Sequence, residues 1–165
     1  MSIHRASVRW QHQGGAFTYD SYSRDHDMVF KQGQLVVAGS AAPQFRGNAH
    51  CLDPEEAFVA ALSSCHMLSF LAICARKRIG VESYEDEAEG VLDKGEMGKL
   101  CMTEVRLKPR IRFTPGQEPA PEELSALHHR AHAECFIANS VRTDVRVISA
   151  EAKDASINSR IGRWR

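Results

Sequence analysis

The stretch Asp53-Pro54-Glu55-Glu56-Ala57-Phe58-Val59-Ala60-Ala61-Leu62-Ser63-Ser64-Cys65-His66-Met67 decides how this chain of 165 residues folds. It begins as a helix, because Asp53 can cap, Pro54 suits the first helical position and Glu56 falls at the capping-box position. The pattern predicts that the helix continues to Ile79 and that Gly80 ends it. A helix of about 26 residues would be ~39 Å long at 1.5 Å per residue.

Residues 58–75 of this helix are apolar on nearly every face. A helix that is apolar all round must be buried on all sides, and a single small sheet cannot wrap it. We therefore expect a subunit interface, with two antiparallel central helices related by a two-fold axis. The interface of this homodimer would bury more than ~2,000 Å².

Strands are predicted on both sides of the helix. Alternation of apolar and polar residues predicts one hairpin from 6–10 and 17–19 and a second from 28–30 and 35–37. Segments 81–92 and 100–113 predict a longer hairpin, in which glutamates face basic residues across the strands on a solvated surface. A second helix over 121–138 and a last strand over 143–150 complete an α+β fold in a single domain, 1–165.

The charge balance argues against two classes of partner. There are 21 Lys+Arg and 21 Asp+Glu, a net charge of zero, whereas duplex DNA and anionic membranes select a basic surface. The longest nearly apolar stretch, 67–75, is shorter than the ~20 residues of a membrane span. The first ten residues contain no apolar region typical of a signal peptide, so a cytoplasmic protein without nucleic-acid or membrane partners is expected.

The number and spacing of the five cysteines do not predict a disulfide framework, because the number is odd and no CxxC pair occurs. Buried structural cysteines, scattered metal ligands and a catalytic thiol all remain possible. His132 and Cys135 share a helix face, but a zinc site would also need Cys65 or His66 together with the segment 50–51. That spacing is irregular, so neither a metal nor a cofactor is expected.

Two motifs carry a resemblance to a known family. Residues 53–67 resemble the first-cysteine motif of the OsmC/Ohr family, the osmotically inducible protein C and organic hydroperoxide resistance proteins. The segment His-Ala-Glu-Cys-Phe-Ile-Ala-Asn-Ser-Val (132–141) resembles the second-cysteine motif, and the separation of ~70 residues matches as well. The residues after Cys135 depart from the organic hydroperoxide pattern and are similar to the OsmC-like branch.

The resemblance implies a long buried central helix in an intertwined dimer, and a thiol-dependent peroxidase acting on organic hydroperoxides. Cys65 would be the peroxidatic cysteine and Cys135 the resolving one, with an external thiol as reductant. The family holds an arginine with a glutamate near the first cysteine. Glu55 corresponds to the glutamate and Arg24 to the arginine, with Arg46 as its substitute.

Two questions stay open at this level. Glu55 lies ten residues before Cys65, which is ~15 Å along a straight helix and about 80° around it, so we expect the partner chain to supply this carboxylate. His66 and His132 could donate protons to the leaving oxygen, although His66 is expected to be packed. The competing function is an OsmC-like small-molecule-binding or thiol-sensing protein without significant peroxidase turnover.

Overall fold

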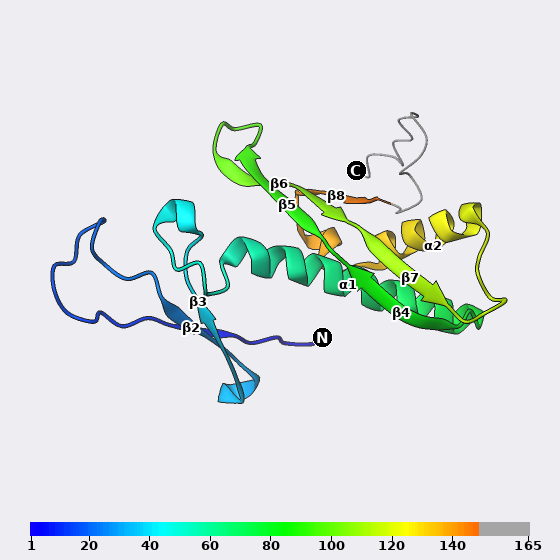
Figure 1. Ribbon diagram of the computed structural model, residues 1–165, viewed down its shortest axis with the longest axis horizontal. Coiled ribbons are helices and arrows are strands. Elements are labelled where there is room, and N and C mark those ends of the chain that lie inside the picture. The colour runs from blue at the N-terminus through cyan, green and yellow to red at the C-terminus, as the bar shows by residue number, and fades with distance from the viewer. Residues whose placement is uncertain (149–165) are drawn as a thin grey trace. The chain divides into compact units, whose positions relative to one another are not determined.

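The computed structural model describes residues 1–148, which form two compact units, residues 1–57 and a second unit that begins at Phe58. Mixed helices and antiparallel sheets confirm the predicted α+β class (Figure 1). In chain order the helices and strands are β1 (Ser7–Arg9), β2 (His26–Phe30), β3 (Leu35–Gly39), α1 (Pro54–Lys77), β4 (Val81–Asp86), β5 (Glu89–Lys94), β6 (Leu100–Leu107), β7 (Pro109–Phe113), α2 (Pro121–Glu134) and β8 (Asp144–Val147).

The first unit contains a three-stranded antiparallel sheet in the order β1–β2–β3. The predicted hairpin of 28–30 and 35–37 is confirmed, with Met28 opposite Val37 and Phe30 opposite Leu35. The predicted strand at 6–10 is confirmed as β1, which pairs with β2.

The predicted strand at 17–19 is wrong, because this segment turns instead of extending. The backbone N–H groups of Ser21 and Tyr22 both donate to the Thr18 carbonyl, at 3.1 Å, and this closes the turn. Phe17 packs beside Trp10 with ring centroids 5.8 Å apart, so the alternating aromatic residues build a side-chain cluster and not a sheet face.

Helix α1 begins as the sequence predicts. The Glu56 N–H donates to Asp53 Oδ1 at 2.7 Å, and the Asp53 N–H donates in return to Glu56 Oε2 at 3.2 Å. This reciprocal pair is the capping box, and it satisfies backbone donors that the helix itself cannot pair.

The end of α1 differs from the prediction. Arg78, with φ at 62°, adopts the left-handed conformation that stops the helix, and the Ile79 N–H then donates to the Cys74 carbonyl at 2.9 Å. Glycine is usually preferred at this position, so Gly80 was the expected stop. Gly80 instead lies against Thr114 and Gln117, where an added Cβ would come within 3 Å of both side chains.

The second unit carries two sheets. Strands β4 and β7 form an antiparallel pair, and β5–β6–β8 form a three-stranded sheet in which β8 runs parallel to β6. Each long predicted strand is thus divided, at 87–88 on one side and at Lys108 on the other. The predicted last strand is confirmed over Asp144–Val147, while residues 149–150 of that prediction lie outside the described part of the chain.

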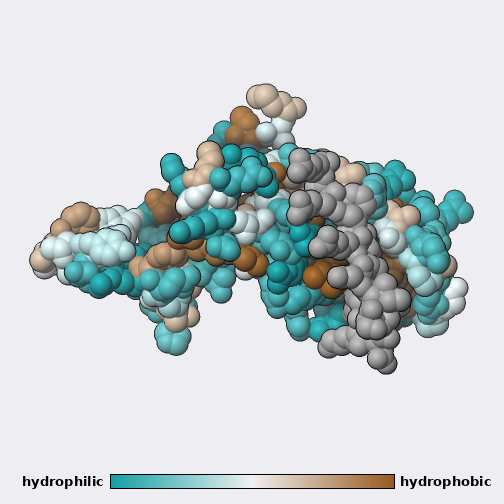
Figure 2. Space-filling model, turned by 90° about the horizontal axis from the view of Figure 1, so that it is seen from above, coloured by the Kyte–Doolittle hydropathy of each residue, from teal (hydrophilic) through white to brown (hydrophobic). Residues whose placement is uncertain are grey.

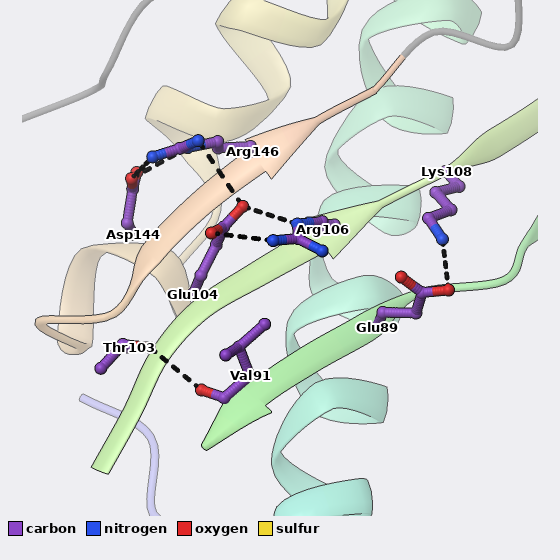
Figure 3. Close-up of polar contacts among 8 residues, drawn as sticks. All are labelled: Glu89, Val91, Thr103, Glu104, Arg106, Lys108, Asp144 and Arg146. Atoms are coloured by element: carbon purple, nitrogen blue, oxygen red, sulfur yellow. Dashed lines mark hydrogen bonds and ion pairs between the residues drawn. The ribbon is translucent and has the colours of Figure 1, made fainter. Parts of the chain in front are cut away.

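Acidic and basic side chains of these strands pair both across strands and within one strand. Glu89 pairs with Lys108, and Glu104 accepts hydrogen bonds from Arg106 of its own strand and forms an ion pair with Arg146 on β8 (Figure 3). Arg110 and Arg112 are likewise paired with glutamates. The basic ladder is therefore neutralised by its own sheet.

Helix α1 packs against both sheets of the second unit (Figure 1). One core cluster joins it to α2, β4 and β7, and a second joins it to β6 and β8. The residues of α1 that are buried within the chain are Leu62, His66, Phe70, Ile73 and Cys74. These positions follow a 3.6-residue period and define one inner face.

The opposite face of α1 is apolar and exposed in the single chain. It contains Ala61, Ser64, Leu68 and Ala75, at spacings of three, four and seven residues, and the Leu68 side chain is 61% exposed. Hydrophobic residues also appear among the hydrophilic ones on the face seen in Figure 2. The second unit by itself therefore covers only one side of α1.

By length and composition, α1 is the one helix within residues 1–148 that could cross a membrane. The apolar stretch found in the sequence, residues 67–75, is shorter because it counts a nearly uninterrupted run of apolar residues. Over a longer window the mean hydropathy of α1 stays high, because many of the other residues are small. Central helices of globular folds have the same character, and the inner face of α1 packs against two sheets.

Replacing Asp53 with alanine removes the acceptor for the Glu56 N–H and should lower the free energy of unfolding by about 1 kcal/mol. Urea denaturation at a fixed protein concentration measures the change. Asp53→Asn, which keeps a side-chain acceptor, is the matched control and should stay within ~0.5 kcal/mol of the wild type. Equal stability of the alanine and asparagine variants would contradict the capping role.

Candidate active site

The two motif cysteines, 70 residues apart in sequence, meet in the second unit. Cys65 lies in the middle of α1, and Cys135 directly follows α2, because the chain turns to an extended conformation there and ends the helix at Glu134, earlier than the predicted end at 138. The two sulfurs accept hydrogen bonds from consecutive backbone N–H groups, those of Ile137 and Ala138. The fold therefore brings together the two residues that the sequence selected, and both are free thiols.

The turn after α2 adds two main-chain donors to this pair. The Ile137 N–H donates to Cys65 Sγ at 3.5 Å, and the Ala138 N–H donates to Cys135 Sγ at 3.4 Å. N–H donors favour a negatively charged sulfur over a neutral one. These donors were missed at the sequence level, because backbone groups leave no residue signature.

The two thiols have unequal surroundings. Cys65 is half-buried, whereas Cys135 is only 1% exposed. Burial, and then the hydrogen bond to Cys65, raise the pKa of the Cys135 thiol above its ordinary value. Cys135 is thus held protonated as a donor toward Cys65, and Cys65 is the more accessible sulfur.

The other cysteines lie apart from this pair. Cys74 is buried in the core cluster with Phe70 and Ile73, and burial raises the pKa of its thiol. Cys101 is exposed on β6, and Cys51 is half-buried in the first unit. Their surroundings fit structural or incidental roles.

A pair of histidines joins the two helices, α1 and α2. His66 Nε2 is 3.1 Å from His128 Nδ1, and both side chains are buried. Burial, with smaller contributions from His128 and His132, lowers the pKa of His66 to about 3, and burial lowers that of His128 to about 4. Both imidazoles are therefore neutral near pH 7. The expected packing of His66 is confirmed.

His132 is half-buried near the end of α2, and its carbonyl accepts the Cys135 N–H at 3.1 Å. Burial and the neighbouring His129 lower the pKa of His132, while Asp144 on β8 raises it. Within residues 1–148, no group of three or more His, Cys, Asp or Glu side chains is arranged to hold a metal ion.

Glu55 and the two candidate arginines belong to the first unit. Glu55 lies in the first turn of α1, half-buried. Arg24 donates to the carbonyls of Tyr19 and Tyr22, and its guanidinium lies 3.9 Å from the centre of the Tyr22 ring. Arg46 lies in the same cluster.

Arg46 pairs with Asp20 at 2.8 Å, and its guanidinium lies 5.6 Å from the centre of the Tyr19 ring. Among the ion pairs of residues 1–57, neither Arg24 nor Arg46 is joined to Glu55. The roles suggested for Glu55 and Arg24 therefore stay predictions.

The fold and the site thus define a protein in which two free cysteines from different helices lie at consecutive main-chain N–H groups, an arrangement whose chemistry is that of thiols. The sequence model for OsmC-like proteins matches residues 47–149. Its share of the chain, together with the structural matches below, shows that the chain belongs to the OsmC/Ohr family.

Solved structures support the same fold. An OsmC-like protein of unknown function from Vibrio cholerae is 45% identical over 90% of this chain and 99% of its own, with a TM-score of 0.85. An organic hydroperoxide resistance protein from Elizabethkingia anophelis is 20% identical over 90% and 95%, with a TM-score of 0.65. OhrB of Bacillus subtilis is 20% identical over 90% and 98%, with a TM-score of 0.61. No curated protein shows significant similarity to the chain.

The buried histidines make stability depend on pH. Their pKa values are about 3 and about 4 in the folded chain but near 6.5 when unfolded, so the unfolded state binds more protons below pH 6.5. The free energy of unfolding should thus fall as the pH drops from 6.5 toward 4, by up to about 1.4 kcal/mol per pH unit for each imidazole.

Urea denaturation between pH 4.5 and 7.5 tests this dependence on the wild type and on the double variant His66→Gln, His128→Asn. The stability advantage of the wild type should shrink as the pH falls. Exposed His4, replaced by asparagine, is the control and should leave the slope unchanged. Parallel slopes for the wild type and the double variant would contradict the neutral buried pair.

Proposed function

We propose that the protein is a cysteine-based peroxidase that reduces organic hydroperoxides. The convergence of the Cys65 and Cys135 sulfurs on the consecutive N–H groups of Ile137 and Ala138 is the observation that carries the proposal. A binding protein has no need of two thiols brought together from distant helices, and the unequal burial of the two sulfurs suits an attacking and a resolving partner.

In the first step the Cys65 thiolate attacks the peroxide. An S–O bond forms, the O–O bond breaks, and the alkoxide takes up a proton and leaves as the alcohol. Cys65 is then a sulfenic acid. The Ile137 N–H, which points at this sulfur, stabilises the thiolate before attack.

In the second step Cys135 resolves the sulfenic acid. Its sulfur attacks Cys65, the S–S bond forms, the S–O bond breaks, and the hydroxide leaves as water with the proton of the Cys135 thiol. An external dithiol then exchanges with the disulfide, restoring both thiols and becoming a disulfide itself. No metal or cofactor enters the cycle.

Apolar surface beside the thiols favours an organic substrate. Phe136 follows Cys135 directly and is 81% exposed. An alkyl or aryl hydroperoxide can bury carbon against this side chain, whereas hydrogen peroxide cannot.

The working unit in this proposal is a cytoplasmic homodimer. The exposed apolar face of α1, which contains Ala61, Ser64 and Leu68, matches the spacing of an antiparallel helix pair with a second copy. Small residues on it allow close approach of the two helices. An interface above ~2,000 Å² would bury the face that the single chain leaves open.

The dimer also supplies the missing cation. Glu55 lies ten residues before Cys65 on α1, and in its own unit it forms no ion pair with Arg24. Antiparallel pairing brings the N-terminal part of one α1 beside the middle of the other. Glu55 of one chain would then orient an arginine, Arg24 or Arg46, beside Cys65 of the partner chain.

The cysteines should differ in their effects on turnover. Cys65→Ser removes the nucleophile and should abolish peroxide consumption with cumene hydroperoxide and dithiothreitol. Cys135→Ser should keep the first oxidation but leave Cys65 as a sulfenic acid that dimedone traps. Cys51→Ser, Cys74→Ala and Cys101→Ser are the controls, expected within a few-fold of the wild type.

Thiol titration separates the enzyme from the alternative. One equivalent of cumene hydroperoxide per chain should remove two thiols, since each catalytic cycle oxidises both cysteines. A chain that loses no thiols would be a binding protein of the same fold. A chain that loses two thiols but is not turned over by dithiols would be a thiol sensor. Full activity of Cys65→Ser would end the proposal.

A mixed dimer tests assembly of the site across the two chains. Cys65→Ser and Glu55→Ala chains are unfolded together, refolded and assayed. With sites shared between chains, one site of the heterodimer carries both changes and the other is intact, so activity should rise above that of either parent. Light scattering checks that the species is a dimer. No gain on mixing, or a stable monomer at micromolar concentration, would contradict the shared site.

A further inference from the structure

Two buried histidines join the helices that carry the two thiols. His66 on α1 and His128 on α2 are 3.1 Å apart through Nε2 and Nδ1. Their rings are stacked, with planes 12° apart and centroids 5.4 Å apart, and Phe70 stacks on His128 at 4.5 Å. His66 is 1% exposed and His128 9%, so the hydrogen bond lies inside the core.

This pair is costly if it serves only to fill space. His66 Nδ1 is buried and has no hydrogen-bond partner among residues 1–148. A buried polar atom without a partner destabilises a fold, and two apolar side chains of similar size would avoid that loss. Positions that break a packing rule in this way often serve function.

The pair lies close to the thiols in both helices. His66 directly follows Cys65. His128 precedes Cys135 by seven residues, which is two helical turns and only about 20° around α2. On α2 the position of Cys135 thus follows the face of His128, about 10 Å further along, whereas on α1 Cys65 lies about 100° around the helix from His66.

We propose that the His66–His128 hydrogen bond is a positioning clamp that fixes α1 against α2 and thereby holds the Cys65 and Cys135 sulfurs together for disulfide formation. The biological role of this clamp rests on the proposed peroxidase function, because the disulfide forms in the peroxidase cycle. Both histidines are positioning residues, because neither needs to touch the peroxide. They act on the resolving step, in which the S–S bond forms, the S–O bond of the sulfenic acid breaks, and water leaves.

A hydrogen bond suits this task better than an apolar contact. Apolar attraction is non-directional, whereas a hydrogen bond weakens steeply as its angle and length change, so it adds a directional constraint to the close packing of the two helices. Displacement of reacting atoms by ~1 Å can slow a reaction ~100-fold. By thermodynamic linkage, the free energy by which the clamp stabilises the disulfide equals the free energy by which the disulfide stabilises the clamp.

The test compares pairs of substitutions in the full chain. His66→Leu with His128→Leu replaces both partners by apolar groups and leaves no new unpaired nitrogen. His66→Gln with His128→Asn keeps a hydrogen bond between amides placed near the original nitrogens. Thermal unfolding checks that each variant is folded.

The first readout is the equilibrium between the Cys65–Cys135 disulfide and the dithiol in glutathione buffers, which needs no peroxide. The leucine pair should lower this constant about tenfold, and the amide pair should stay within about threefold of the wild type. The second readout separates the two steps with cumene hydroperoxide. Dimedone-trapped sulfenic acid should form at the wild-type rate, and only disulfide formation should slow.

The outcomes are distinct. A folded leucine pair with a wild-type disulfide constant would overturn the clamp, since packing alone would then suffice. If the leucine pair does not fold, the amide pair decides: a constant near that of the wild type supports the clamp, and a tenfold loss overturns it. If the wild type fails to react with peroxide, the peroxidase proposal fails, while the glutathione measurement still tests the clamp.

Discussion

Helices α1 and α2 meet along one buried contact, and the second unit is organised around it. Phe70 and Ile73 of α1 pack with Leu127 and Ala131 of α2, and strands β4 and β7 cover the cluster. Because protein interiors are close-packed, this contact sets the relative position of the two helices closely. Everything placed along it, including thiols and imidazoles, takes its geometry from the same packing.

Polar groups within that contact are arranged asymmetrically. Each sulfur receives one main-chain N–H, but Cys65 is half-buried whereas Cys135 is buried. The low polarity of the surroundings favours neutral forms, as the lowered pKa of His66 illustrates. Burial likewise raises the pKa of the Cys135 thiol, and this asymmetry of surroundings distinguishes the two sulfurs.

Local signals predicted the elements well where one signal dominated. The capping box at Asp53 and Glu56, the hairpin at 28–37 and the ladder of ion pairs on the long hairpin are all present. Predictions were wrong where one sequence pattern is compatible with two different structures. Alternation at 17–19 came from aromatic clustering, and Arg78 adopted the left-handed conformation expected of Gly80.

The sequence by itself determined the fold class, the family and the choice of Cys65 and Cys135 as candidate site residues, because periodicity, caps and motifs are local properties of the chain. Tertiary structure alone decided which atoms meet. The Ile137 N–H on the Cys65 sulfur and the hydrogen bond between His66 and His128 each join residues more than 60 positions apart. Contacts of that kind depend on how two helices pack, and packing is a property of the whole core that no short pattern encodes.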